Sequence, residues 1–372
     1  MNIPLAKPFV GDDEYAALKP IMESGWLGMG ATVGEFERAV SDYIGCKHSL
    51  AVNTGTNAIH IALETVGVEG KEVIVPSMTY AATIQAILMA GGTPVFAECR
   101  EDDLNLDIDD AIARITPKTK VILPVHYAGK SVDMDRLLEI AEIHKLTIIE
   151  DAAHAFGSLY KNRKIGSFGH LTCFSFDPIK TITCGEGGAV CTNDKKFADR
   201  ITHMRVLGIS KNTWDRYKSE RPWLYDVIDK GFRYHMSNLN AAIGLVQMNK
   251  LQKLIAVRKE IAARYDAEFN TLNEIAILEH DLKETVPFCY TIRILNGKRD
   301  SFMSYMKECG IGVSILYIPN HQQQFFKKYS QKLPITEKLA EEFVSIPLFA
   351  GMLNEEAGYI IEKVKTFDRG AM

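Results

Sequence analysis

Asp151 and Lys180 are two side chains whose types and positions in this sequence could do chemistry together. Asp151 follows an apolar run at 146–149 that predicts a buried strand of a parallel sheet. Its carboxylate would then lie at the carboxyl end of a strand, where open α/β sheets bind their ligands. Lys180 follows a second short run at 173–176 and lies in a loop that becomes glycine-rich at 185–188.

A lysine held in a pocket loses hydration, so its pKa falls and its neutral amine becomes a nucleophile toward carbonyl groups. Pyridoxal phosphate (PLP) requires such a lysine for covalent attachment and a carboxylate that keeps its pyridine nitrogen protonated. Each residue also has a plain structural interpretation, because most loop lysines are solvated charges and a strand-end aspartate is usually a helix N-cap. The pair therefore predicts a PLP site only together with the sequence around it.

The composition is that of a globular enzyme with 372 residues, of which 47% are hydrophobic and 24% charged. A net charge of −4 gives no electrostatic reason to expect nucleic acid or an anionic membrane as a partner. The N-terminus has no signal-peptide pattern, and no apolar run approaches the roughly 20 residues of a membrane helix. The seven cysteines contain no CxxC pair, so we expect reduced thiols in a cytoplasmic protein and no metal site.

Short apolar runs alternate with amphipathic helices from residue 49 to 192, which is typical of a parallel, doubly wound α/β sheet. The predicted strands are 49–52, 73–75, 93–97, 121–125, 146–149 and 189–192, and helices are expected at 59–66, 107–115 and 132–144. Before this region, helices are predicted at 12–24 and 35–44, on either side of a glycine-rich turn around Trp26 that is either a mouth loop or a connector.

A long helix is expected at 239–272, and beyond it the pattern changes. Strands at 286–295 and 312–317 and helices at 300–309, 336–343 and 355–365 predict a small α+β domain. We therefore expect a large PLP-binding α/β domain over residues 1–245, which includes the N-terminal segment, and a smaller C-terminal domain over residues 246–372, joined by the long helix.

Three further stretches could bind a ligand. The small-residue turn at 53–58 opens a helix, so it is either a phosphate cradle or an ordinary N-cap. Tyr80 follows a predicted strand and could stack on a flat ring or lie in the core. The polar and aromatic stretch at 208–230 is long for a connection, as binding loops and lids are.

Taken together, these motifs resemble one family, the sugar-nucleotide aminotransferases of the DegT/DnrJ/StrS type, which are PLP enzymes with the aspartate-aminotransferase fold (fold type I). The resemblance covers essentially the whole chain, and several blocks in the right order make it specific. The blocks are 24–27 (SGWL), 53–56 (NTGT), 76–80 (PSMTY), 150–153 (EDAA), 174–180 (FSFDPIK), 185–188 (GEGG), 236–244 (MSNLNAAIG), Pro319, His321 and 346–349 (IPLF).

The resemblance implies catalytic roles for Lys180, which would bind PLP as a Schiff base and transfer the proton, and for Asp151, which would pair with the pyridinium nitrogen. Thr56 and Asn57, helped by Ser175, would hold the phosphate, and Tyr80 would stack on the ring. His154 stands where the family often has Gln beside the phenolic oxygen of the ring. An imidazole N–H can donate the same hydrogen bond, but its charge state would then tune the cofactor.

The segment from Gly231 to Met236 departs from the family pattern. Many relatives carry Asn and Arg where this chain has Arg233 and His235. In the family, this segment of the dimer partner reaches the phosphate, so Arg233 or His235 is expected to contact the cofactor here. A structural role for either residue stays open.

The implied reaction is a ping-pong transamination in a homodimer with shared active sites. L-glutamate would be the amino donor, and the acceptor a nucleotide-linked keto sugar, with an NDP-4-keto-6-deoxyhexose giving a 4-amino sugar for surface polysaccharide or glycoconjugate. Candidate substrate contacts are Trp26, Glu186, His321 and the 208–230 stretch.

Amination at C3 of a 3-keto sugar is an alternative. So is a PLP-dependent deoxysugar dehydratase, although relatives of that class have His in place of the lysine, so Lys180 favours transfer. An idle PLP-fold regulator or binding module is a third possibility, which loss of Asp151 or Lys180 or an added DNA-binding arm would favour.

Overall fold

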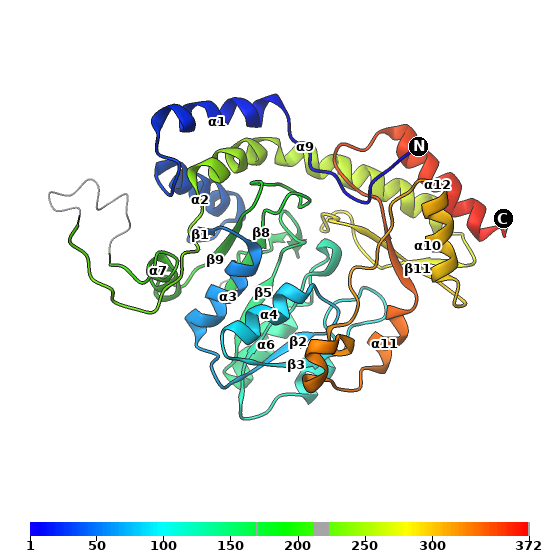
Figure 1. Cartoon of the computed structure of the whole chain (residues 1–372). Helices are drawn as coiled ribbons and strands as arrows, with labels where there is room; N and C mark the ends of the chain where they lie inside the picture. Colours follow the sequence, from blue (N-terminus) through cyan, green and yellow to red (C-terminus); the bar gives the residue numbers. More distant parts are fainter. Residues whose placement is uncertain (169, 211–222, 371–372) are drawn as a thin grey trace.

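The computed structural model describes residues 1–168, 170–210 and 223–370, and Figure 1 shows their arrangement. Within these ranges, a seven-stranded sheet forms the centre of a larger part and a three-stranded sheet the centre of a smaller part. The long helix α9 (Asn238–Phe269) runs along both (Figure 1). The expected architecture, a large and mostly parallel α/β sheet with a small C-terminal domain, is confirmed.

The large sheet contains all six strands predicted between residues 49 and 192. It orders its strands as β1 (His48–Val52), β9 (Gly188–Thr192), β8 (Leu171–Ser175), β5 (Thr147–Asp151), β4 (Thr119–Ile122), β2 (Glu72–Pro76) and β3 (Thr93–Ala97). Only the pairs that include β9 are antiparallel, because the chain returns from β8 to β9 through a loop without a crossover helix.

Helices cover both faces of this sheet (Figure 1). One face packs against α3 (Gly55–Val66), α4 (Ala81–Met89) and α7 (Lys195–Met204). The other packs against α2 (Ala31–Ile44), α5 (Ile108–Ala113), α6 (Met134–His144) and part of α9. Successive side chains of a strand point to opposite faces, so Ile149 and Ile148 lie in different cores, and Asp151 shares the face of Ile149, under α3 and α4.

The small sheet corrects two of the sequence predictions. Its strands are β10 (Ile275–Ile277), β11 (Tyr290–Ile294) and β12 (Phe343–Ile346), all antiparallel. The strand predicted at 312–317 is wrong, because this segment makes a single bridge, Ser314 to Ser345, and then leaves the sheet. The helix predicted at 336–343 runs instead from Pro334 to Ala340 as α11, since the apolar run that follows pairs with β11.

The remaining elements complete the two parts. They are α1 (Asp12–Ser24), η1 (Tyr127–Gly129), β6 (Leu159–Tyr160), β7 (Arg163–Lys164), α10 (Arg299–Glu308), η2 (Asn320–Gln322), η3 (Gln324–Tyr329) and α12 (Asn354–Asp368). No helix in the described ranges is long and apolar enough to cross a membrane. All seven cysteines are free thiols, and five of them are buried.

The expected boundary between residues 245 and 246 falls inside α9, which is continuous there. The N-terminal segment reaches the smaller part, where Ile3 is buried in the core beside α9 and pairs with Ile311. Most of the predicted 208–230 loop, residues 211–222, lies outside the described residues. On either side of it, Ile209 pairs with Val227.

Arg258 connects the two parts from the middle of α9. Its Nη1 donates hydrogen bonds to the carbonyl oxygens of Phe288 (3.0 Å) and Leu348 (3.3 Å), and its Nη2 to the carbonyl oxygen of Lys180 (3.5 Å). The side chain is 3% exposed, and burial lowers the pKa of its guanidinium to about 10. One buried side chain thus fixes the Lys180 loop relative to the small domain.

Candidate active site

A cavity of about 470 Å³ opens at the carboxyl edge of the large sheet. It lies between the ends of β5 and β8, the first turns of α3 and α4, the Lys180 loop, and Leu316 and Tyr317 from the smaller part. This is the edge at which parallel α/β sheets bind ligands. Both Asp151 and Lys180 line this cavity, as their positions after strands predicted.

The first turn of α3 lies against the end of β8 because glycines permit a close approach. A Cβ at Gly55 would lie 2.6 Å from the Cβ of Ser175 and 2.9 Å from its hydroxyl oxygen. A Cβ at Gly188 would lie 2.5 Å from the Thr54 carbonyl oxygen. Gly55, Thr56 and Ser175 therefore line the same cavity at the N-terminus of α3, where the helix dipole favours an anion.

Asn57 belongs to the same turn but does not line the cavity. Its backbone N–H donates to the Thr54 hydroxyl (3.1 Å) as part of the N-cap, and its side chain donates to Asn53 Oδ1 (2.7 Å). Of the two alternatives that the sequence left open, the structure shows the N-cap, and the phosphate cradle stays a prediction. The turn is an N-cap at Thr54, and it presents Gly55 and Thr56 to the cavity.

Lys180 extends its amine into the cavity, 4.2 Å from the centre of the Phe288 ring. Burial lowers the pKa of this amine below its ordinary value, while Asp177 and Asp151 act in the opposite direction. The loop is held by the Lys180 N–H, which donates to the Asp177 carbonyl oxygen at 3.1 Å, and by Arg258. A lysine in this environment provides a neutral amine at lower pH than a solvated one does.

Asp151 is 5% exposed and accepts two hydrogen bonds. The Thr83 hydroxyl donates to Oδ2 at 2.7 Å, and the Ala153 N–H donates to Oδ1 at 3.1 Å. Burial raises the pKa of the carboxyl group in spite of these donors. A cationic ring nitrogen at this position would offset the cost of the buried charge.

His154 lies on the Phe288 ring, with the ring centres 4.1 Å apart and the planes at 17°. Its Nε2 is 3.1 Å from the Tyr317 hydroxyl, and Nδ1 is buried without a hydrogen-bond partner in the described part of the chain. Burial, together with the nearby Lys180, holds the pKa of this imidazole well below its ordinary value.

The sequence analysis missed Phe288 and Tyr317. Both come from the small domain and reach the site only because the two parts of the fold are packed together. Their aromatic character would have been the only signal in the sequence, and most aromatic residues are simply core.

The other predicted contacts fall into two groups. Tyr80, 61% exposed at the N-terminus of α4, and Glu186 both line the cavity. Burial, and to a lesser degree Asp177, raises the pKa of the Glu186 carboxyl group. The cavity lining does not include Trp26, His321, Arg233 or His235.

Each residue outside the cavity has contacts of its own. Trp26 Nε1 donates to the Met29 carbonyl oxygen at 2.9 Å. His321 is 3% exposed, with Nδ1 2.7 Å from the Ser77 hydroxyl and Nε2 3.2 Å from Glu337 Oε1. Arg233 forms a backbone bridge with Val206, just after α7, and His235 forms one with Val52, at the end of β1.

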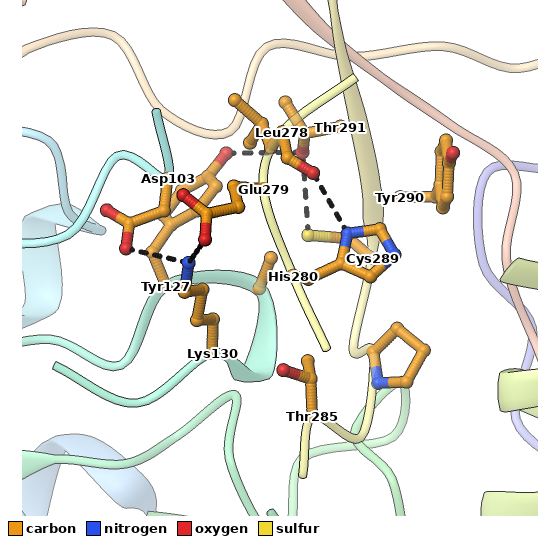
Figure 2. Close-up of a pocket in the computed structure, with 12 residues that line it drawn as sticks. Asp103, Tyr127, Lys130, Leu278, Glu279, His280, Thr285, Cys289, Tyr290 and Thr291 are labelled. Carbon is orange, nitrogen blue, oxygen red and sulfur yellow. Dashed lines mark hydrogen bonds and ion pairs between the residues drawn. The ribbon is translucent and has the colours of Figure 1, made fainter. Parts of the chain in front are cut away.

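A second cavity lies beside the small sheet and is shown in Figure 2. Its volume of about 30 Å³ has room for little more than one water molecule. Its Lys130 amine is already paired with two carboxylates, since Nζ lies 3.3 Å from Asp103 Oδ2 and 3.8 Å from Glu279 Oε1 (Figure 2). It is not a site for a cofactor-sized ligand.

The larger cavity fits PLP by the chemistry of its groups. The α3 turn with Thr56 and Ser175 suits a phosphate, Asp151 a protonated pyridine nitrogen, and Lys180 an aldehyde. The close approach at Gly55, which leaves no room for a side chain between the α3 turn and Ser175, is consistent with a phosphate bound by this turn.

Comparison with known proteins gives one consistent result. The profile of the DegT/DnrJ/EryC1/StrS aminotransferase family matches residues 8–365. The chain is 36% identical over 380 residues to the spore coat polysaccharide biosynthesis protein SpsC of Bacillus subtilis, a match that covers 99% of this chain and 98% of that protein.

Solved structures agree over the full length. A sugar aminotransferase of Streptococcus pneumoniae, Spr1654, described as putative and solved in its PMP form, superposes with a TM-score of 0.94 at 29% identity and 100% coverage of both chains. The same protein has been solved in a PLP form. Helicobacter pylori PseC, an aminotransferase involved in pseudoaminic acid biosynthesis, gives a TM-score of 0.93 at 27% identity, again with 100% coverage of both chains.

Replacing Gly55 with Ala should weaken PLP binding by at least about 10-fold and lower the free energy of unfolding by about 1–3 kcal/mol. The new methyl group would push the first turn of α3 away from Ser175 and misplace the phosphate contacts. Titration of the cofactor-free protein with PLP, together with thermal unfolding, measures both effects. Gly358→Ala in α12, whose nearest neighbour would be 3.9 Å away, is the matched control. Tight PLP binding by Gly55→Ala would show that the phosphate lies elsewhere.

Replacing Lys180 with Met should raise the melting temperature of the cofactor-free protein at neutral pH, because the buried charge no longer has to be desolvated. The pKa of the Lys180 amine is lower in the folded protein than in the unfolded chain. At pH values between the two, the unfolded chain binds a proton at this amine and the folded protein does not, so the stability of the wild type rises with pH in this range. The advantage of Met should therefore be largest below the folded pKa and shrink as pH rises.

Thermal melts across a pH series test this prediction. Lys19→Met is the control, since Lys19 is exposed on α1 and its weak pair with Glu23 spans 3.8 Å. A gain that grows with pH, or no gain, would contradict the assignment of a desolvated amine.

Proposed function

The chain belongs to the DegT/DnrJ/EryC1/StrS family of PLP-dependent sugar aminotransferases, and from this premise we propose that it transfers the amino group of L-glutamate to a nucleotide-linked keto sugar. The acceptor is an NDP-4-keto-6-deoxyhexose, and the product is a 4-amino sugar for surface polysaccharide, including lipopolysaccharide, or another glycoconjugate. The observation that carries the proposal is one cavity that holds Lys180, Asp151 and the first turn of α3. SpsC, named for polysaccharide biosynthesis, supports this pathway class.

In such a reaction, different residues of the cavity would have different roles. Bound PLP supplies an electron sink for the carbon that gains or loses the amino group. Asp151 stabilises positive charge at the pyridine nitrogen, and the α3 turn with Thr56 and Ser175 binds the phosphate. Tyr80 stacks on the ring, and Glu186 lies where it can contact substrate.

Lys180 binds the cofactor and afterwards, as a free amine, holds and returns the proton at the reacting carbon. Its lowered pKa suits this role, because a proton carrier works best when its pKa lies near the working pH. The presence of this lysine also favours transfer over the dehydratase alternative. The cytoplasmic location suggested by the cysteines stays a prediction.

The purified protein with PLP should show a visible absorption band that borohydride reduction or Lys180→Ala abolishes. Excess L-glutamate should convert this band, and an NDP-4-keto-6-deoxyhexose should restore it with formation of an amino sugar. Lys180→Ala should lower the rate of transfer by at least about 10²-fold. Spectra and product analysis by mass spectrometry and NMR measure these outcomes. A band that glutamate does not change would contradict L-glutamate as the amino donor. Amination of 3-keto sugars alone would show that the amino group is transferred to C3. Loss of water from the sugar without transfer of an amino group would show that the protein is a dehydratase.

We also propose a homodimer in which Arg233 or His235 of one subunit reaches the PLP phosphate of the other. Arg233 is exposed and lines no part of the cavity of its own chain. His235 has a buried Nδ1 without a partner in the described ranges, and burial, Arg233 and Arg205 lower the pKa of its imidazole. An exposed cation beside an imidazole whose Nδ1 has no partner in the described ranges is consistent with a phosphate contact supplied by a second copy of the chain.

Subunit mixing tests this arrangement. Lys180→Ala and Arg233→Ala should each be inactive alone, but co-refolded mixtures should regain activity, because each mixed dimer has one site with both residues intact. The pair Lys180→Ala and Asp151→Asn is the control, since both residues belong to the same site and mixing cannot restore it. His235→Ala, mixed in the same way, identifies which of the two residues contacts the phosphate. No recovery with either variant would refute the shared site.

A further inference from the structure

Tyr317 is the residue through which the small domain enters the cavity. It follows the segment that leaves the small sheet after Ser314, and its ring lies against Tyr80 with 5.3 Å between the ring centres. Its hydroxyl is 3.1 Å from His154 Nε2. No other hydrogen-bond partner of this hydroxyl is present among the described residues. The hydroxyl thus has one hydrogen-bond partner among the described residues, and Tyr317 lines the large cavity.

The surroundings of His154 determine the direction of this hydrogen bond. The imidazole is neutral, because burial holds its pKa well below its ordinary value, so it carries one proton. A proton on Nδ1 would be a buried N–H donor without an acceptor in the described part of the chain, whereas a bare Nδ1 is only an unused acceptor. In proteins, a buried N–H group without an acceptor is rarer than a buried acceptor without a donor. The proton therefore belongs on Nε2, which donates to the Tyr317 oxygen.

This direction leaves the hydroxyl hydrogen of Tyr317 free to donate into the cavity. The hydroxyl keeps its hydrogen, because burial raises the pKa of Tyr317 well above its ordinary value and Cys289 and Asp151 add to the effect. His154 then orients Tyr317 and does not itself donate to the ligand.

The acceptor of this hydrogen bond follows from the chemistry of PLP and the position of Lys180.

 In PLP, the carbon that carries the aldehyde lies between the carbon with the phenolic oxygen and the carbon with the phosphate arm. The phosphate is assigned to the α3 turn, so the phenolic oxygen lies on the other flank of the carbon that Lys180 attacks. His154, Tyr317 and Lys180 line the same cavity, and the Lys180 amine is close enough to lower the pKa of the His154 imidazole, so the His154–Tyr317 pair lies near the amine.

We propose that the Tyr317 hydroxyl donates the hydrogen bond to the phenolic oxygen of the cofactor, and that the His154 N–H holds this hydroxyl in position. The inference rests on the proposed PLP chemistry, but it does not depend on the identity of the amino donor or of the sugar acceptor. It differs from what the family resemblance implies, in which the residue at the position of His154 makes this contact itself.

Tyr317→Phe tests the proposal in the full-length protein loaded with PLP. A donor to the phenolic oxygen stabilises the negative charge of the unprotonated chromophore, so its loss should raise the pH midpoint of the visible spectral change. The expected rise is about one to two pH units, the size of one hydrogen bond to a charged group. The measurement is a spectrophotometric pH titration without glutamate or sugar, so failure of the proposed donor or acceptor would not affect it.

Tyr127→Phe is the matched control. Its hydroxyl contacts the Leu316 carbonyl oxygen and lies 3.3 Å from the Thr291 hydroxyl, so it anchors the same segment without lining the large cavity. This variant should lower the melting temperature and leave the pH midpoint where it is in the wild type. If Tyr317 were only structural, Tyr317→Phe would behave in the same way.

Two changes at His154 separate an indirect role from a direct contact. His154→Gln retains an N–H donor and should keep the midpoint near that of the wild type, whereas His154→Leu should raise it by less than Tyr317→Phe does. In the Tyr317→Phe background, His154→Leu should cause no further shift, because it acts only through the hydroxyl.

Three results would overturn the proposal. The first is a folded Tyr317→Phe variant whose pH midpoint is unchanged. If the KM for the sugar rises in that variant while the midpoint stays the same, the hydroxyl contacts the substrate and not the cofactor. The second is a further shift from His154→Leu in the Tyr317→Phe background, which would assign the contact to His154. The third is a wild-type protein without a visible band, which would remove the PLP chemistry as well.

Discussion

The buried guanidinium of Arg258 is the interaction on which the geometry of the site depends. It donates to carbonyl oxygens of the Lys180 loop and of two segments of the smaller part, Phe288 and Leu348. In the described part of the chain this cation has no carboxylate partner, and the hydrogen bonds to these carbonyl oxygens offset part of the cost of its burial. The Lys180 loop and the segment that carries Phe288 therefore have little freedom to separate, and Phe288 in turn contacts both the Lys180 amine and the His154 ring.

Desolvation shifts the pKa values of Lys180, His154 and Asp151 in one consistent sense. Burial lowers the pKa values of Lys180 and His154 and raises that of Asp151, so each group is pushed toward its neutral form. A cofactor with a cationic ring nitrogen and an anionic phosphate supplies the opposite charges that Asp151 and the α3 turn lack. The site is thus arranged for a ligand that carries its own charges.

Much of this arrangement could be predicted from the sequence, for local reasons. Asp151 and Lys180 follow short apolar runs, and in a parallel sheet such positions meet at the carboxyl edge. The strands at 312–317 and the C-terminal end of the helix at 336–343 were predicted wrongly, because similar apolar runs compete for one sheet and pairing with β11 decides between them. No local pattern separates a segment that pairs from one that makes a single bridge and turns toward the cavity.

The sequence by itself determined the α/β class, the lysine and carboxylate of the site, and the N-cap turn of α3, because each depends on residue type and on neighbours close in the chain. Only the tertiary structure decided that Tyr317 and Phe288 belong to the site. It also decided that His321 and Trp26 form hydrogen bonds outside the cavity, and that Asn57 belongs to the N-cap of α3. These outcomes depend on how α9 and Arg258 place the small domain against the large sheet. Contacts between residues so distant in the chain arise from packing, and the spacing of residues along the sequence does not encode them.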